Sequence, residues 1–242
     1  MSSALLYGCE TWLTNNVKSV EKWYHASLKE LLGVRSQTPN DLVLIETSLP
    51  TVKAFVGSRQ KAFFHKLNTS DHFPESPVQF AIDLAKTTKS PMGNYITAIE
   101  RKENNIKDLD IAQLKVKIHN CDSSRAKAYR ELNKELEYHR MYSARLSVHE
   151  KHRKGATRIR LSHRLKIETG RWSRIPREQR LCQCAESIQT ESHVLIECRL
   201  TDTIRRTYSQ LNFVDISALM QSQDVHSLCK YCFDVLNYFE NI

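Results

Sequence analysis

Glycine and proline are scarce in this chain, and their scarcity constrains the fold more than any other sequence feature. The 242 residues include only 6 glycines and 6 prolines, whereas an average protein spends about 12% of its residues on the pair. Because β-sandwiches and barrels need both residues at their many turns, the composition favours helices. With 40% hydrophobic and 26% charged residues, we expect a folded, soluble protein and not a disordered one.

Helical spacing of apolar residues supports this expectation in the N-terminal part of the chain. Apolar residues recur at helical intervals over 17–32, and Gly33 follows at the position of a C-terminal cap. The Thr-Pro pair at 38–39 predicts the start of a short helix that ends near residue 47. A third apolar stripe predicts a helix over 52–67.

The remaining pattern is also mainly helical. Residues 68–77 read as a loop by composition. Residues 156–170 fit a helix or a strand, and we favour the helix. Further helices are predicted near residues 78–88, 92–103, 109–119 and 124–150, with a closing amphipathic helix over 225–239.

The net charge of +9 is confined to one segment of the chain. Residues 151–180 hold eleven basic and two acidic side chains, so the charges of all other residues sum to zero. We interpret this segment as a surface for RNA or DNA, with Trp172 available for base stacking; the alternative is a solvated helix face. The predicted nucleic-acid-binding residues are Lys151, Arg153, Lys154, Arg158, Arg160, Arg164, Lys166, Arg171, Trp172 and Arg174.

Three of the seven cysteines cluster with a histidine. Cys182, Cys184, His193 and Cys198 lie within 17 positions, and three thiolates with one imidazole are a ligand set for structural zinc. The single residue between the first two cysteines is a tighter spacing than the usual two to four. The alternative is a set of ordinary buried thiols with a surface histidine.

The spacing of the last two ligands, His193 and Cys198, requires a local departure from a regular helix. Thr190 can cap a short helix over 191–196, but positions five apart on a regular helix point about 140° apart. The helix must therefore loosen before Cys198 if both residues share one ion. Four protein ligands leave no open coordination position, so the predicted zinc is structural. Cys229 and Cys232 lie on the apolar stripe of the last helix, which favours core packing for both.

Motifs for self-contained catalysis are not found. The sequence has no glycine-rich phosphate loop and no nucleophile elbow, and the nearest acid pair, Asp108 and Asp110, fits a helix start. No apolar run approaches the roughly 20 residues that span a bilayer, and no basic residue precedes the apolar patch at 4–7. We therefore expect no enzyme activity, no membrane contact, no small-molecule substrate, and an intracellular, reducing location in cytoplasm or nucleus.

Several short motifs, in order, resemble the reverse transcriptase polyproteins of non-LTR (LINE-type) retrotransposons. The first is similar to the motif that follows the polymerase palm, and the last to the zinc-binding-like element near the end of those proteins. The matching stretches are Ala4–Trp12, Leu31–Val34, Leu49–Pro50, Ser58–Lys61, Phe63–Phe64, Arg180–Cys184 and Gln189–Cys198.

We predict a division of the chain into four consecutive segments, of which the resemblance itself implies the thumb-like first segment and an RNA-binding and zinc-knuckle-like region from 156 to about 200. They are a thumb-like helical segment over 1–67, a helical linker or bundle over 68–150, a basic nucleic-acid-binding segment with the zinc element over 151–200, and a C-terminal helical segment over 201–242. The parent family is an RNA-directed DNA polymerase, but Tyr-x-Asp-Asp and adjacent aspartates are absent, and nucleotidyl transfer needs carboxylates for its metal ions. The family motif begins almost at Met1, which suggests a truncated copy or a partial gene model, without its endonuclease and polymerase parts.

Three interpretations follow. The first is an RNA- or primer-template-binding fragment of such a polymerase, without the catalytic site. The second is a helical protein-interaction module that a structural zinc stabilises, or a decayed fragment without function. A metal-dependent enzyme is the third, and a closed four-ligand site counts against it.

Overall fold

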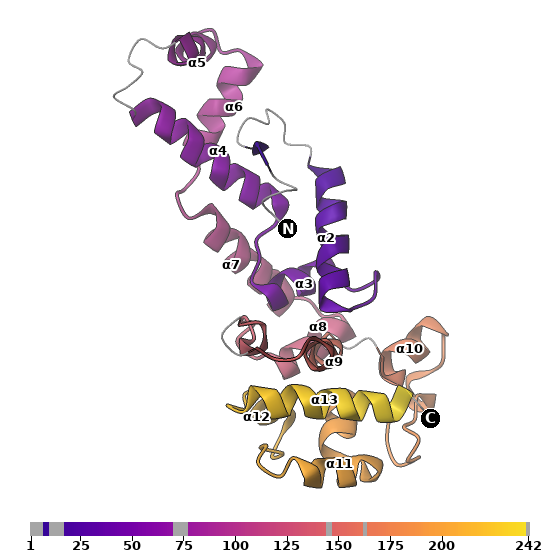
Figure 1. Ribbon diagram of the computed structural model, residues 1–242. Helices are drawn as coiled ribbons and strands as arrows, with labels where there is room; N and C mark the ends of the chain where they lie inside the picture. The colour runs from indigo at the N-terminus through magenta and orange to yellow at the C-terminus, as the bar shows by residue number, and fades with distance from the viewer. Residues whose placement is uncertain (1–6, 10–16, 70–76, 144–146, 162–163, 241–242) are drawn as a thin grey trace. The chain divides into compact units, whose positions relative to one another are not determined.

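A computed structural model describes residues 7–9, 17–69, 77–143, 147–161 and 164–240 of this chain (Figure 1). The described residues are mainly helical, which confirms the predicted fold class. Their only β-structure is an isolated antiparallel bridge between Leu181 and Ile188. Within these ranges, no helix combines the length and the apolar composition needed to cross a lipid bilayer.

The helices follow the predicted order closely. Gly33 ends the first of them with a φ of +67°, as expected of a glycine cap. Residues 70–76, in the predicted loop 68–77, lie outside the described residues. The α-helices are α2 (Lys18–Leu32), α3 (Asn40–Thr47), α4 (Val52–Thr69), α5 (Pro77–Thr87), α6 (Pro91–Glu100), α7 (Ile106–His119), α8 (Ser124–Leu132), α9 (Glu150–Arg160), α10 (Lys166–Trp172), α11 (Asp202–Thr207), α12 (Ile216–Met220) and α13 (Val225–Glu240). Shorter turns are the 3-10 helices η2 (Arg140–Tyr142), η4 (Arg177–Gln179) and η6 (Arg199–Thr201), and the π-helix η5 (His193–Glu197).

Internal packing divides the chain into two units. Unit 1 comprises the described residues within 1–25 and 49–114, and unit 2 those within 26–48 and 115–242. One unit boundary falls within α2, one between α3 and α4, and one within α7. This grouping by packing runs across the four consecutive segments predicted from the sequence.

Unit 1 contains a helical hairpin of α5 and α6, and α6 also packs on α4 (Figure 1). Its small core consists of Phe64, Ile82, Ile96 and Ile99. Gly93 sets the closeness of the hairpin, because a Cβ atom added there would lie 2.0 Å from the carbonyl oxygen of Ala85. Any other residue at this position would force the two helices apart.

Unit 2 holds the larger core, built around the pairing of α9 with α13 (Figure 1). A Cβ atom added to Gly155 of α9 would lie 2.8 Å from the Cα atom of Phe233 on α13, so this glycine permits their close approach. Cys229 and Cys232 are fully buried in the same core, which confirms their predicted packing role. Burial raises the pKa of Cys229 to about 12.

A buried ion pair ties α3 to α9 within unit 2. The Nε and Nη2 atoms of Arg160 donate to the two carboxylate oxygens of Glu46 at 2.6 and 3.0 Å. The hydroxyls of Tyr129 and Tyr142 donate to the same carboxylate at 2.7 and 2.9 Å. Burial, followed by the nearby charge of Glu46, raises the pKa of both tyrosines well above 10, so both remain protonated donors.

The predicted helix over 124–150 is wrong. Helix α8 ends at Leu132, the backbone turns through Leu136 with a φ of +48°, and α9 begins only at Glu150. A continuous helix would separate Tyr129 and Tyr142 by about 20 Å, whereas both must reach one carboxylate. Tertiary contacts therefore outweigh the helix propensity of this stretch.

The described residues of the ambiguous stretch 156–170 contain no strand, but the favoured helix is interrupted, because residues 161, 164 and 165 are not helical. It is divided between the end of α9 and the start of α10, and residues 162–163 lie outside the described residues.

Candidate metal centre

A short hairpin positions the first two cysteines of the cluster. The Leu181–Ile188 bridge closes it, and the backbone N–H of Cys182 donates to the carbonyl oxygen of Ser187 at 2.8 Å. Ala185 adopts a φ of +62° and donates its backbone N–H to Cys182. This left-handed turn brings the Cys184 side chain back toward that of Cys182.

A capped and loosened helix positions the other two members. The Thr190 hydroxyl accepts a hydrogen bond from the backbone N–H of His193 at 3.1 Å, as predicted for a helix cap. The turn that follows is the π-helix η5, in which the N–H of Cys198 donates to the carbonyl of His193 at 2.7 Å. The wider π turn provides the loosening that the five-residue spacing requires.

The four side chains converge in the interior of unit 2. One ligand atom from each of Cys182, Cys184, His193 and Cys198 lies within 4.8 Å of all the others, and all four residues are buried. The Sγ atoms of Cys182 and Cys198 are 3.7 Å apart, and Cys184 Sγ lies 3.2 Å from Nε2 of His193. The cluster predicted from sequence can therefore hold a metal ion.

The cysteines of the cluster differ in acidity. Burial opposes ionisation of Cys184, but hydrogen bonds from the Glu186 backbone and from His193 outweigh burial and lower its pKa to about 7. Burial raises the pKa of Cys198 to about 12 and also raises that of Cys182. A divalent cation among the sulfurs would favour the thiolate form of all three.

Contacts beyond the four side chains fix their backbone. Arg205 donates to the carbonyl oxygen of Cys198 at 2.9 Å, and Arg199 to that of Cys184 at 3.2 Å. The Oε2 atom of Glu197 lies 3.5 Å from Nδ1 of His193, on the side of the ring away from the sulfurs. A carboxylate at this nitrogen is a usual partner of a metal-bound imidazole.

The predicted nucleic-acid-binding residues of α9 are mostly engaged in contacts within unit 2. Lys154 pairs with Glu150 at 2.6 Å, and Nε of Arg158 donates to the carbonyl oxygen of Gly33 at 2.9 Å. Lys151 is exposed, and Arg153 is partly exposed.

Arg160 corrects the prediction at one position. Its side chain is 2% exposed and is bonded to Glu46, which is fully buried. The attraction of Glu46 outweighs the burial penalty and raises the pKa of Arg160 above its usual value. This guanidinium is not available to a phosphate, so its assignment to a nucleic-acid surface is wrong.

The basic residues of α10 and the turn after it are exposed instead. Arg164, just before the helix, is partly exposed and lies 3.4 Å from Glu240. Lys166, Arg171, Trp172 and Arg174 are all exposed, and so is Arg177. We call Lys166, Arg171, Trp172, Arg174 and Arg177 the α10 basic face.

Sequence reasoning missed two neighbours of α10. The guanidinium of Arg35 lies over the Trp172 ring, 4.6 Å from its centroid, a contact that no sequence spacing signals. Arg125 is also missed: it is 3% exposed, near Glu168 and Glu191. Burial lowers the pKa of Arg125 to about 10 and raises that of Glu191 to about 7.

Hydrogen bonds join the α10 helix to the cysteine hairpin. The side-chain oxygen of Gln189, which is 3% exposed, accepts the backbone N–H of Lys166 at 2.8 Å. Its main-chain carbonyl accepts from Ile167. Arg180, at the hairpin entrance, donates to the carbonyl oxygens of Ile167 at 2.8 Å and Ile175 at 2.9 Å. The hairpin that carries two cluster cysteines thus also fixes the start of α10.

The acid pair noted in the sequence serves a structural purpose in unit 1. Asp108 lies in the first turn of α7, as expected for a helix start. Asp110 accepts from the N–H and the hydroxyl of Thr51 at 2.7 and 3.0 Å.

Comparisons of the chain with protein-family models, with curated proteins and with solved structures give no match.

Proposed function

We propose that this chain binds nucleic acid through the α10 basic face, and that a structural zinc ion in the cysteine cluster stabilises the hairpin that holds this face in place. The connection through Gln189 and Arg180 is the observation that carries the proposal, because it joins exposed cations to a metal-binding element.

The donor set and its spacing fit zinc. With Zn–S bonds near 2.3 Å and Zn–N bonds near 2.0 Å, a tetrahedral ion holds two sulfurs about 3.8 Å apart and a sulfur and a nitrogen about 3.5 Å apart. The corresponding distances are 3.7 Å between Cys182 and Cys198, and 3.2 Å between Cys184 and His193. Three sulfurs and Nε2 of His193 would fill the coordination shell, so zinc would supply structural stability and no reactive water.

The α10 basic face has the two features that single-stranded nucleic acid requires. Its lysine and arginines can neutralise phosphates, and the exposed Trp172 ring, backed by Arg35, can stack on a base. A solvated helix face normally carries charges of both signs, whereas cations prevail here: Glu168 is buried and lies 3.6 Å from Arg171, and Glu178 of η4 is the one exposed acidic residue within 164–180.

At the family level, we propose that the chain represents the thumb and zinc-element part of a non-LTR retrotransposon reverse transcriptase. The support is the order of motifs from Ala4–Trp12 to Gln189–Cys198 in the sequence. The sequence carries no Tyr-x-Asp-Asp motif, so binding without polymerisation is the expected behaviour.

A fluorescence-anisotropy titration of labelled single-stranded RNA tests the binding proposal. Replacing Lys166, Arg171, Arg174 and Arg177 with glutamine should weaken binding at low salt at least tenfold, because four phosphate contacts are lost. The matched control replaces four exposed cations elsewhere in unit 2, Lys127, Lys134, Arg206 and Lys230, and should change affinity less than twofold. Equal losses in both variants would place the binding surface elsewhere. Indifference of the wild-type chain to RNA would select the alternative of a zinc-stabilised protein-interaction module.

A primer-extension assay tests the absence of chemistry. The purified chain should show no template-dependent extension with Mg²⁺ or Mn²⁺, while a full-length element protein serves as the positive control. Extension that survives removal of contaminating polymerase would overturn the fragment interpretation.

A further inference from the structure

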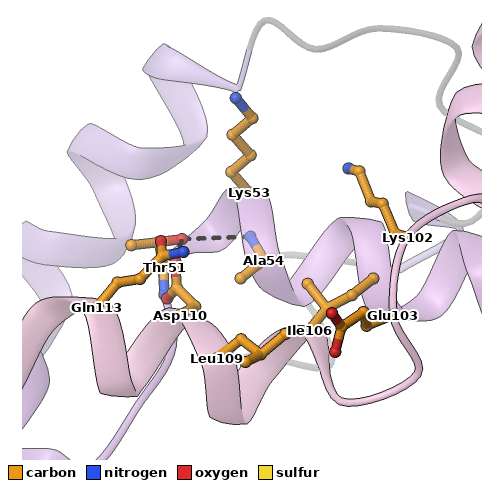
Figure 2. A pocket seen from close by; sticks show the side chains of 9 residues that line it. All are labelled: Thr51, Lys53, Ala54, Lys102, Glu103, Ile106, Leu109, Asp110 and Gln113. Atoms are coloured by element: carbon orange, nitrogen blue, oxygen red, sulfur yellow. Dashed lines mark hydrogen bonds between the residues drawn. The ribbon is translucent and has the colours of Figure 1, made fainter.

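A cavity of 330 Å³ lies in unit 1, between the first turns of α4 and α7 (Figure 2). Ala54, Ile106 and Leu109 form an apolar floor, and Leu109 is 38% exposed there. The volume falls within the range of small-molecule sites, roughly 300 to 1,000 Å³. None of its lining residues belongs to the metal centre or to the α10 basic face.

The ammonium groups of two lysines lie on one side of this apolar floor. Figure 2 shows the Lys53 and Lys102 side chains extending toward the same side of the cavity. Burial lowers the pKa of Lys102, and the positive charge of Lys53 lowers it further. In the part of the chain that the structure describes, neither ammonium pairs with a carboxylate.

The two acidic residues of the cavity wall form no ion pair with these lysines. Both oxygens of Asp110 accept hydrogen bonds from Thr51, where they hold the start of α4. In the view of Figure 2, the Glu103 carboxylate extends away from the Lys102 ammonium. The cavity therefore combines an apolar surface with two lysine ammonium groups that form no ion pair within the described residues.

We propose that this cavity binds a phosphate monoester with an aromatic group, of the nucleoside monophosphate type. The phosphate lies between Lys53 and Lys102, and the aromatic group lies on Ala54, Ile106 and Leu109. A phosphate dianion can be shared by both ammonium groups, whereas a carboxylate neutralises only one. The proposal is independent of the proposed RNA-binding function, because it concerns other residues in the other unit.

Isothermal titration calorimetry of the full chain with AMP tests this site. We expect one AMP per chain, with adenosine and ribose 5-phosphate each binding at least tenfold more weakly. The Lys53→Gln/Lys102→Gln variant should lose at least tenfold in AMP affinity. The control Lys66→Gln/Lys89→Gln removes two exposed lysines of the same unit and should stay within twofold of wild type.

A second pair of measurements separates the ligand sources and guards against misfolding. Lys53→Arg/Lys102→Arg keeps both positive charges and should retain AMP binding. Retained binding would show that a chain substituted at both positions still folds. A 5′-phosphorylated trinucleotide that binds more tightly than AMP, and loses this affinity in the Lys53→Gln/Lys102→Gln variant, would identify a strand end as the ligand. Weaker binding than AMP would identify a free nucleotide. The proposal fails if AMP does not bind, if adenosine binds equally well, or if the control variant loses as much affinity.

Discussion

Helices α9 and α10 are both rich in basic residues, but they use them differently. On α9, Arg160 is buried against a carboxylate and Arg158 donates to a backbone carbonyl. At α10, Lys166, Arg171 and Arg174 are exposed. The difference follows from packing, because α9 lies in the core against α13, whereas α10 is hydrogen-bonded to the cysteine hairpin. A cluster of basic residues in a sequence therefore predicts a binding surface only for those residues that are not buried in the core.

Removing the metal should have the largest effect of the changes considered, and it should affect α10 but not α9. One zinc per chain is expected by elemental analysis, lost in Cys182→Ser and Cys198→Ser and retained in Cys229→Ser. Because structural zinc contributes on the order of 10 kcal/mol to small metal-bound folds, chelation should greatly lower the stability of the hairpin. In hydrogen exchange, α10 should lose protection while α9 keeps it. Zinc loss in the Cys229→Ser variant alone would contradict the ligand assignment.

Truncating the buried arginine should cost more stability than truncating an exposed one. Arg160→Met leaves Glu46 as an unpaired buried charge, so the free energy of unfolding should fall by about 3–5 kcal/mol. Arg174→Met, on the α10 basic face, should change it by less than about 0.5 kcal/mol. Urea denaturation measures both values. The Glu46→Gln/Arg160→Met double variant removes the unpaired charge and keeps a side-chain oxygen as acceptor for the tyrosine hydroxyls, so it should regain part of the loss. Similar values for the two single variants would contradict the difference between α9 and α10.

A smaller effect is expected at the joint between α10 and the hairpin. Gln189→Ala removes the acceptor for the Lys166 N–H and should destabilise unit 2 by about 1–3 kcal/mol. We expect RNA affinity to fall several-fold while the zinc content stays at one per chain. Gln179→Ala, an exposed neighbour in η4, serves as the control. Unchanged RNA affinity in Gln189→Ala would mean that the joint does not position the basic face.

The sequence predicted those features that depend on local patterns. Apolar spacing located α2, α4 and α13, and the ligand types with the Thr190 cap located the metal cluster, including its loosened turn. The sequence alone could not predict that α8 ends at Leu132. This helix end depends on the hydroxyls of Tyr129 and Tyr142, which donate to Glu46 in a distant part of the chain.

Other features could not be predicted from the sequence, for the same physical reason. The burial of Arg160 and the stacking of Arg35 on Trp172 arise from packing between segments that are far apart in sequence. Lys53 and Lys102 likewise line one cavity only when the turn between α6 and α7 packs near the start of α4.

The salt dependence of RNA binding tests the central claim most directly, because each phosphate contact adds about 0.7 to the slope of log Kobs against log salt for a single strand. Lys166→Gln/Arg174→Gln/Arg177→Gln removes three exposed cations of the α10 basic face and should reduce that slope by about 2. Lys154→Gln/Arg158→Gln/Arg164→Gln removes the same charge from residues engaged in contacts within unit 2 and should leave the slope unchanged. Equal reductions in the two variants, or a reduction only in the second, would contradict the assignment of nucleic-acid binding to the α10 basic face.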